Sequence, residues 1–184
     1  MTSEARSDPL AGFKRSQVPL AHVEFEAFCQ RHYAELCRAL YLYCGNADLA
    51  EDVAQETMAR AYAQWNRRQN IASLEGWTFR VGTNLIKSHF RRKRTERRAL
   101  SNETETADSQ EQQVITALTI HNALGQLPQR QRVVLILRYF LDLSVAETAE
   151  LMRCPEGTVK TLTRRGLGRL ESLIGQIQGE DHGS

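Results

Sequence analysis

The stretch Leu143 to Leu173, LSVAETAELMRCPEGTVKTLTRRGLGRLESL, contains two helical patterns separated by a short break. The first pattern opens with a capping box. The hydroxyl of Ser144 can accept from the amide of Glu147, whose carboxylate reaches back to the amide of Ser144. A proline disfavours the α region at the residue before it and is tolerated at the start of a helix. The first helix is therefore predicted to end near Arg153, and the second to begin close to Pro155.

The second helix of this stretch has an apolar side and a basic side. Apolar or small residues recur at spacings of three and four, and they are Val159, Thr163, Gly166, Leu167, Leu170, Leu173 and Ile174. The other side carries Lys160, Thr161, Arg164 and Arg165. Two short helices on a tight turn, the second one basic, predict a helix-turn-helix whose second helix can enter a major groove. The stretch alone also fits an ordinary amphipathic hairpin with a solvated basic side.

The charge of the chain is unevenly distributed. The 184 residues fit one medium domain or two small ones, and the formal net charge is +2. Residues 21–98 hold 13 basic and 9 acidic residues, residues 99–113 hold none and 4, and residues 114–177 hold 8 and 5. Two basic segments joined by an acidic one suggest a polyanionic partner that is contacted at two places.

The sequence contains no apolar run long enough for a membrane span, and its polar start is broken by prolines and a glycine, unlike a signal peptide. We therefore expect a soluble, intracellular chain with a disordered tail at residues 1–20.

Metal and catalytic chemistry are not expected. Cysteine and histidine residues occur within one predicted helix, but no C-x2-C pair is present, so half-buried thiols are the better interpretation; these residues are Cys29, His32, Cys37 and Cys44. Cys154 is interpreted in the same way. The sequence has no G-x-x-x-x-G-K-[ST], H-E-x-x-H or G-x-S-x-G motif, and its five histidines are dispersed.

Two helices are predicted in the first part of the chain. The first has an apolar stripe that ends at Gly45, a natural helix end; its members are Val23, Phe25, Phe28, His32, Leu36, Leu40 and Tyr43. In the next, Asp48 to Trp65, the apolar set recurs every four residues, at Leu49, Val53, Thr57, Ala61 and Trp65. Asp48 and Glu51 can cap its start, whereas Gln55 and Glu56 lie too far along to gain from the helix dipole.

A further helix is predicted from about Glu75. Trp77, Val81 and Leu85 should face the core, and the other side carries Arg80, Asn84, Lys87, Ser88 and Arg91. The helix continues into the basic residues 91–94 and 97–98, with aromatic neighbours at Trp77, Phe79 and Phe90. This combination suits phosphates and unstacked bases. The basic run also fits a solvated tail.

Four motifs in this order resemble the extracytoplasmic-function (ECF) sigma factors of bacterial RNA polymerase, over roughly residues 25–173. They are LAEDVAQE at 49–56, WTFRVGTN at 77–84 followed by the basic cluster, LPQRQR at 127–132 and GTVK at 157–160. The run of Arg165, Gly166 and Leu167 resembles the actinobacterial branch. The resemblance implies an all-α fold of two small helical domains: a sigma region 2 domain at 21–98, an acidic linker at 99–113, a sigma region 4 domain at 114–177 and a tail at 178–184.

The resemblance also implies roles for individual residues. The polymerase β′ clamp would be bound by Asp48, Asp52, Gln55 and Glu56. The promoter −10 element would be opened and recognised by Arg80, Asn84, Lys87, Arg91 and Arg92, with Asn84 at the pocket for a captured base. The −35 element would be recognised by Thr158, Lys160, Thr161, Arg164 and Arg165.

As an ECF sigma factor, the chain would bind core polymerase, through the β′ clamp and the β flap, and promoter DNA in the cytoplasm. It would initiate transcription of a specialised stress or envelope regulon. It would need no cofactor, metal, small-molecule substrate or membrane insertion. Whether an anti-sigma factor controls it is left open.

The resemblance has one departure, and two other functions stay open. Many ECF proteins have a basic residue and then a leucine where this chain has Leu162 and Thr163, so either could face DNA. A stand-alone helix-turn-helix regulator and a non-catalytic protein that sequesters a partner are the rival functions. Neither explains why residues 48–98 would combine an acidic helix with a basic, aromatic one.

Overall fold

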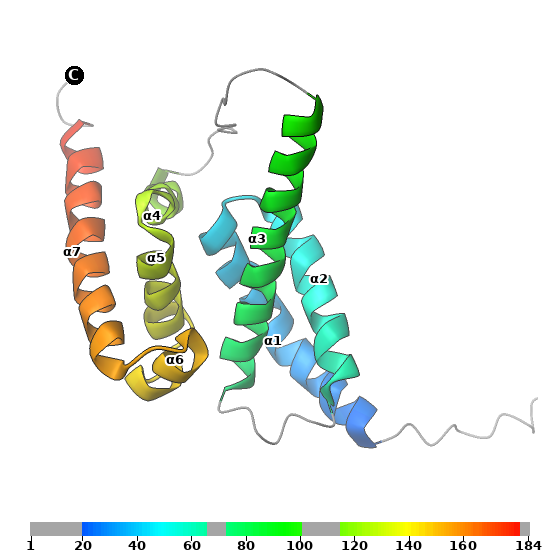
Figure 1. Ribbon diagram of the computed structural model, residues 1–184. Helices are drawn as coiled ribbons and strands as arrows, with labels where there is room; N and C mark the ends of the chain where they lie inside the picture. Colours follow the sequence, from blue (N-terminus) through cyan, green and yellow to red (C-terminus); the bar gives the residue numbers. More distant parts are fainter. Residues whose placement is uncertain (1–19, 66–72, 101–114, 181–184) are drawn as a thin grey trace, which may run out of the picture.

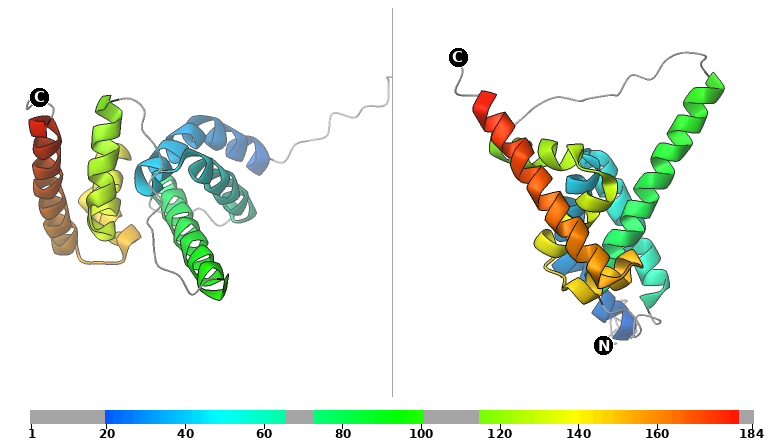
Figure 2. Two further views of the ribbon diagram at one scale, coloured as in Figure 1. Left: turned by 90° about the horizontal axis from the view of Figure 1, so that it is seen from above. Right: turned by 60° about the vertical axis from the view of Figure 1, so that its left-hand side comes forward.

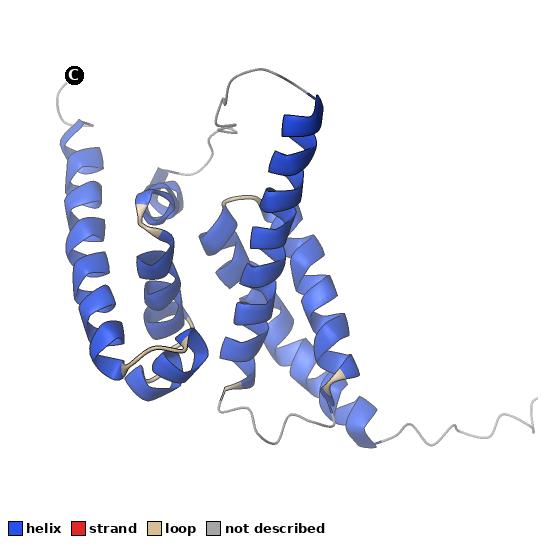
Figure 3. Cartoon of the chain, in the orientation of Figure 1, coloured by secondary structure: helices blue, strands red, loops and turns tan. Residues whose placement is uncertain are grey.

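The computed structural model describes residues 20–65, 73–100 and 115–180, and all regular secondary structure within these ranges is helical (Figure 3). The helices are α1 (Leu20–Cys44), α2 (Ala47–Ala63), α3 (Leu74–Leu100), α4 (Ile115–Gln126), α5 (Gln129–Leu135), the π-helical turn η2 (Ile136–Phe140), α6 (Val145–Met152) and α7 (Glu156–Glu180). They form a first unit, α1–α3, and a second unit, α4–α7, that lie side by side (Figure 1). The all-α prediction is confirmed. The predicted tail 1–20 and linker 99–113 fall almost entirely outside the described residues.

The first unit is a three-helix bundle whose α1–α2 turn depends on a glycine. Gly45 has φ +77°, a conformation that other residues rarely adopt. The predicted end of the first helix is therefore confirmed. The predicted cap of α2 by Asp48 and Glu51 is wrong, because the cap is Asn46, whose Oδ1 accepts from the amide of Leu49 at 2.7 Å.

The buried side of α3 is not the predicted one. Phe79 and Ile86 are each only 1% exposed, whereas Trp77, Val81 and Leu85 are half-buried. The reason is that α3 packs against α1 and α2 on one side and against α6 on another, so its buried stripe is turned away from the predicted residues. In α1, Val23 is 50% exposed, although it was predicted to begin the buried stripe.

The helix-turn-helix of the second unit forms as predicted. Ser144 and Glu147 make the capping box at the start of α6. Arg153 ends α6 in the left-handed region, with φ 50°, and α7 begins immediately after Pro155. The prediction for the buried side of α7 is partly wrong, because Leu167 is 39% exposed.

The inner side of α7 packs against α5, and it settles the orientation of two neighbouring residues. Gly166 lies against Leu135, and Val159 is fully buried. Leu162 packs into the core of the second unit, whereas Thr163 is half-buried with its hydroxyl enclosed. Leu162 therefore faces inward in this fold.

The two units share a hydrophobic core. Ile136, Leu137 and Leu143 of the second unit belong to the same buried cluster as Phe79 and Leu40 of the first. Helix α6 lies near the start of α3, while the C-terminal half of α3 extends away from α7 (Figure 2). The first turns of α3 are therefore enclosed between the units, and its basic end is open to solvent.

Candidate nucleic-acid interface

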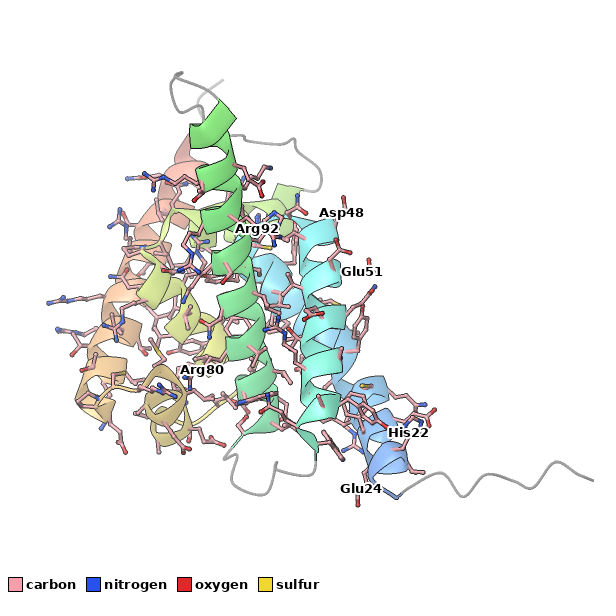
Figure 4. The ribbon with its side chains drawn as sticks, turned by 45° about the vertical axis from the view of Figure 1, so that its right-hand side comes forward. His22, Glu24, Asp48, Glu51, Arg80 and Arg92 are labelled. Atoms are coloured by element: carbon pink, nitrogen blue, oxygen red, sulfur yellow. The ribbon has the colours of Figure 1, made fainter. Side chains whose placement is uncertain are left out.

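The outer side of α2 carries the acidic residues predicted to bind a protein partner. Asp48, Asp52, Gln55 and Glu56 are all exposed, and Asp48 points away from the bundle, as does the nearby Glu51 (Figure 4). Glu56 accepts from Arg60 at 2.7 Å, but both side chains are about half exposed, so this pair contributes only about 0.3–0.5 kcal/mol. Replacing Arg60 in this ion pair with a cation of a partner would therefore cost little free energy. The α2 side is thus a surface of net negative charge that a basic partner can contact.

Most of the predicted −10 residues share one line along α3. Arg80, Asn84, Lys87 and Arg91 follow one another at helical spacings of four, three and four, which places them on one side. Arg92 lies about 100° around the helix from Arg91 and approaches Glu96 at 4.0 Å. The helical spacing therefore brings four of the five residues together and leaves Arg92 on a separate side; Arg80 and Arg92 are labelled in Figure 4.

Arg80 differs from the other cations of this line because the second unit lies against it. Burial lowers the pKa of Arg80, and the positive charge of Arg153 at the end of α6 lowers it further. A cavity of about 180 Å³ separates the units beside it, and its polar lining includes Arg80, Asn84, Lys87, Gln129 and Arg130. Three cations line this cavity together with no carboxylate. Sequence reasoning missed Arg130 and Arg153, because only the packing of the units brings them to α3.

A second hollow lies between α2 and α3, on the other side of Asn84. It has a volume of about 250 Å³, and its lining consists of Arg60, Gln64, Trp77, Val81, Asn84, Leu85 and Ser88. One apolar wall of this groove thus consists of Trp77, Val81 and Leu85, which were predicted to face the core. A cation and an amide lie at the border of the groove. A planar base could pack on this wall while Asn84 donates to its edge or accepts from it.

The aromatic side chains of α3 are not equally available. Phe79 is buried in the core and cannot stack on a base, so that part of the sequence prediction is wrong. Phe90 is 49% exposed on the basic half of α3, where its ring lies edge-on to His89. Phe90 and the half-buried Trp77 are the aromatic groups that α3 offers to a partner.

The outer side of α7 presents the residues predicted to contact duplex DNA. Lys160, Arg164 and Arg165 are exposed, and Thr158 and Thr161 are half-buried. The hydroxyl of Thr161 donates to the carbonyl of Gly157 at 2.9 Å, which leaves its lone pairs available as acceptors. The structure therefore brings all five residues to the N-terminal half of one helix, on the side away from Val159.

The start of α6, the first helix of the helix-turn-helix, is held by a capping box. The amide of Ser144 donates to the Glu147 carboxylate at 2.8 Å, and the amide of Glu147 donates to the Ser144 hydroxyl at 3.1 Å. These hydrogen bonds favour the ionised carboxylate and lower the pKa of Glu147. The cap fixes the entry of the chain into the helix-turn-helix and so helps to position α7.

The cysteines are half-buried free thiols, as predicted, and burial raises the pKa of Cys29, Cys37 and Cys44. Within residues 20–65, 73–100 and 115–180, no group of three His, Cys, Asp or Glu residues is arranged to hold a metal ion. None of the helices in these ranges has the length and apolar character of a membrane span.

Comparisons with known proteins agree with this arrangement. Residues 28–96 match the family model "Sigma-70 region 2", and residues 117–170 match "Sigma-70, region 4". The chain is 34% identical over 142 residues to the ECF RNA polymerase sigma factor EcfG of Rhodopseudomonas palustris, covering 76% of this chain and 78% of that protein. It is 28% identical over 180 residues to the ECF RNA polymerase sigma factor SigM of Mycobacterium tuberculosis, covering 92% of each.

A solved structure has the same fold. The sigma factor RpoE, in its co-crystal structure with the anti-sigma factor NepR from Bartonella quintana, matches with a TM-score of 0.69 at 22% identity. The match covers 83% of this chain and 97% of that chain.

Proposed function

The chain belongs to the ECF sigma factors of the sigma-70 family, and from this premise we propose which surface performs each step of transcription initiation. As a sigma factor it binds core RNA polymerase and directs promoter recognition, −10 melting and initiation of a specialised regulon. The comparisons favour this function over a stand-alone helix-turn-helix regulator. The assignment of surfaces rests on one observation. The acidic side lies on α2, and the two basic sides lie on α3 and α7.

The acidic side of α2 is the proposed contact for the polymerase β′ clamp. Its residues are exposed, and Asp48 points away from the helices (Figure 4), so a basic helix could lie along this side without rearranging the core. This contact would use Asp48, Asp52, Gln55 and Glu56. A second contact, between the β flap and the second unit, follows from the family resemblance.

The proposed site for the −10 element is α3 with its groove against α2. Arg80, Lys87 and Arg91 would hold the phosphates of the separated strand, because cations on one line suit a strand that follows the helix. Asn84 lies at the edge of the apolar groove, where it could hydrogen-bond to a base packed against Trp77 and Leu85. Arg92, on its separate side, would contact a phosphate further along.

The proposed site for the −35 element is the N-terminal half of α7. Lys160 and Arg164 lie one helical turn apart on the exposed side, so both can enter one major groove. Arg164 can pair with a guanine through two hydrogen bonds, while Thr158, Thr161 and Arg165 would contact bases or backbone nearby. Phosphate contacts would set the register and base contacts the sequence preference.

Other features of the family assignment are also proposals. We propose a cytoplasmic location, a non-catalytic role and control by an anti-sigma factor; the co-crystal structure of RpoE with the anti-sigma factor NepR motivates the last of these. The assignment to the actinobacterial branch is supported by residues 165–167 and by the similarity to the mycobacterial SigM, although relatives from Rhodopseudomonas and Bacillus match as well.

A core-binding experiment tests the assignment of the α2 side. The double variant Asp52→Lys with Glu56→Lys should lose binding to core RNA polymerase in a pull-down while its circular dichroism spectrum stays that of the wild type. Glu171→Lys on the exposed side of α7 is the matched control, because it reverses a charge far from α2. Core binding that survives the double reversal would refute this assignment.

A further inference from the structure

The cavity between the two units has one polar end and one apolar end. Its polar residues Asn84, Lys87, Gln129 and Arg130 are exposed, so the polar end opens to solvent. The apolar lining consists of Phe79, Val133, Leu137, Leu151 and Met152, of which Phe79 and Leu137 are buried. The apolar end of the cavity therefore lies inside the molecule.

The apolar end is formed where α6 packs against the first turns of α3. A β-carbon added at Gly76 would overlap Cδ1 of Leu151, so only glycine allows this close approach. Leu151 and Met152 both pack against the core cluster that contains residues of both units. A ligand would thus meet a preformed apolar wall, and binding would not carry the free-energy cost of ordering that wall.

The polar end brings together cations from both units. Arg80 and Lys87 come from α3 and Arg130 comes from α5, and no carboxylate of the described residues lines the cavity. Arg80 is half-buried, and both its burial and the positive charge of Arg153 lower its pKa. A charge that is partly removed from water is stabilised by an opposite charge within hydrogen-bonding distance. Three converging cations therefore favour an anion that contacts α3 and α5 together.

The size and chemistry of the cavity indicate what else the anion carries. The volume is about 180 Å³, and an apolar cavity of about 150 Å³ holds one benzene ring. One ring system the size of a nucleobase therefore fits, and the thioether of Met152 suits contact with an aromatic ring. The side-chain amides of Asn84 and Gln129 each offer donors and an acceptor to the edge of a base.

We propose that this cavity binds a nucleoside diphosphate, with its base against Leu151 and Met152 and its phosphates on Arg80, Lys87 and Arg130. A terminal phosphate carries about 1.5–2 negative charges near pH 7, and the bridging phosphate adds about one, so a diphosphate balances three cations. The site shares Arg80 and Lys87 with the proposed −10 surface, so a bound nucleotide competes with the promoter strand. This competition rests on the proposed function of α3, whereas the binding site itself does not.

Isothermal titration calorimetry of the full-length chain tests the proposal. Adenosine diphosphate and guanosine diphosphate are the nucleotide probes, and at least one of them should bind with one site per chain. Pyrophosphate should bind about tenfold more weakly than the better nucleotide, because it lacks the base and its packing contacts. The matching nucleoside should bind more weakly than the nucleotide as well, because it lacks the charged hydrogen bonds.

Arg130→Gln is the diagnostic variant, because Arg130 lies outside the proposed promoter contacts. It should weaken nucleotide binding about tenfold or more by removing a charge-assisted contact. Arg169→Gln is the matched control, since it removes an equal charge from an exposed position of α7 that does not line the cavity, and it should leave nucleotide binding almost unchanged. Met152→Trp fills the apolar end, so it should weaken nucleotide binding and spare pyrophosphate binding. Circular dichroism melting curves establish that each variant is folded.

Three results would overturn the proposal. The first is no saturable binding of either nucleotide at concentrations up to about 1 mM. The second is an equal loss for Arg130→Gln and Arg169→Gln, which would indicate general attraction to a basic surface. The third is pyrophosphate binding as tight as nucleotide binding, which would exclude the base from the site.

A competition experiment separates this site from the proposed function of α3. The nucleotide should displace a mixed-sequence single-stranded oligodeoxynucleotide from the full-length chain, as measured by fluorescence anisotropy, and Arg130→Gln should reduce this displacement. Nucleotide binding that depends on Arg130 but displaces no strand would refute the proposed role of Arg80 and Lys87 in strand binding. The nucleotide site would stand in that case.

Discussion

Replacing Arg132 with methionine should destabilise the folded chain by about 3 kcal/mol. Its guanidinium donates to three backbone carbonyls: Tyr43 at 2.6 Å, Leu127 at 3.3 Å, and Gly125. A hydrogen bond from a charged group contributes about 1.5–3 kcal/mol. The sum of three such contributions is too high here. The Arg132 side chain is only half-buried, so water can replace part of the lost hydrogen bonding. Methionine keeps most of the apolar contact, so the change isolates the hydrogen bonds.

Thermal and urea unfolding measure this effect. For a chain of this size, a loss of about 3 kcal/mol should lower the melting temperature by roughly 6–12 °C. Arg130→Met is the control, because Arg130 is an exposed neighbour on the same helix and its loss should change stability by about 0.5 kcal/mol or less. Arg132→Lys should fall between the two, since a single ammonium cannot reach three carbonyls at once. Equal melting temperatures for Arg132→Met and Arg130→Met would refute the reasoning.

Three further predictions follow from local contacts. Ser144→Ala removes the cap of α6 and should cost about 1 kcal/mol, seen as a melting temperature lowered by roughly 2–4 °C; an unchanged value would contradict the capping role. Burial and the charge of Arg132 lower the pKa of His121 from its usual 6.5. The contribution of neutral His121 to the free energy of unfolding is therefore complete above pH 6.5 and falls as the pH drops below 6.5. His121→Phe, which keeps the stacking on Tyr41, should lose less stability between about pH 7.5 and pH 5 than the wild type does, as measured by melting temperature; equal losses would contradict this. Arg164→Ala should weaken duplex −35 binding and relax its preference by about 1–3 kcal/mol, whereas Asn84→Ala should spare duplex binding and reduce open-complex formation; equal losses of duplex binding would refute this division.

Local signals correctly predicted the end of α1, the two ends of α6 and the start of α7. The capping box of Ser144, Pro155 after the first helix of the helix-turn-helix, and Gly45 after α1 each act through their own backbone or a neighbour within four residues. Such features need no knowledge of distant contacts, so sequence alone specifies them. The predicted sides of α2 and α7 that carry charge are also exposed. Helix α2 packs against α1 and α3, and α7 packs against α4, α5 and α6, but these contacts use the apolar side of each helix and leave the charged side to solvent.

Non-local packing explains what sequence reasoning missed. Helix α3 has partners on two sides, so a single stripe of Trp77, Val81 and Leu85 could not describe it, and Phe79 proved to be core. Gly76 within the first turn of a helix was a usable signal, because glycine there lowers helix stability and implies a close approach. Nothing in the sequence around Arg132 indicates that it bonds to Tyr43, 89 residues away.

The proposed clamp contact does not depend on how the two units pack. Asp48, Asp52 and Glu56 are exposed, and α2 packs against α1 and α3 of its own unit. A partner that binds two arrangements of the units equally well shifts no equilibrium between them, however tightly it binds. Clamp binding at α2 alone would therefore leave the packing of α4–α7 against the first unit unchanged. A change in that packing would need contacts that differ between the two arrangements.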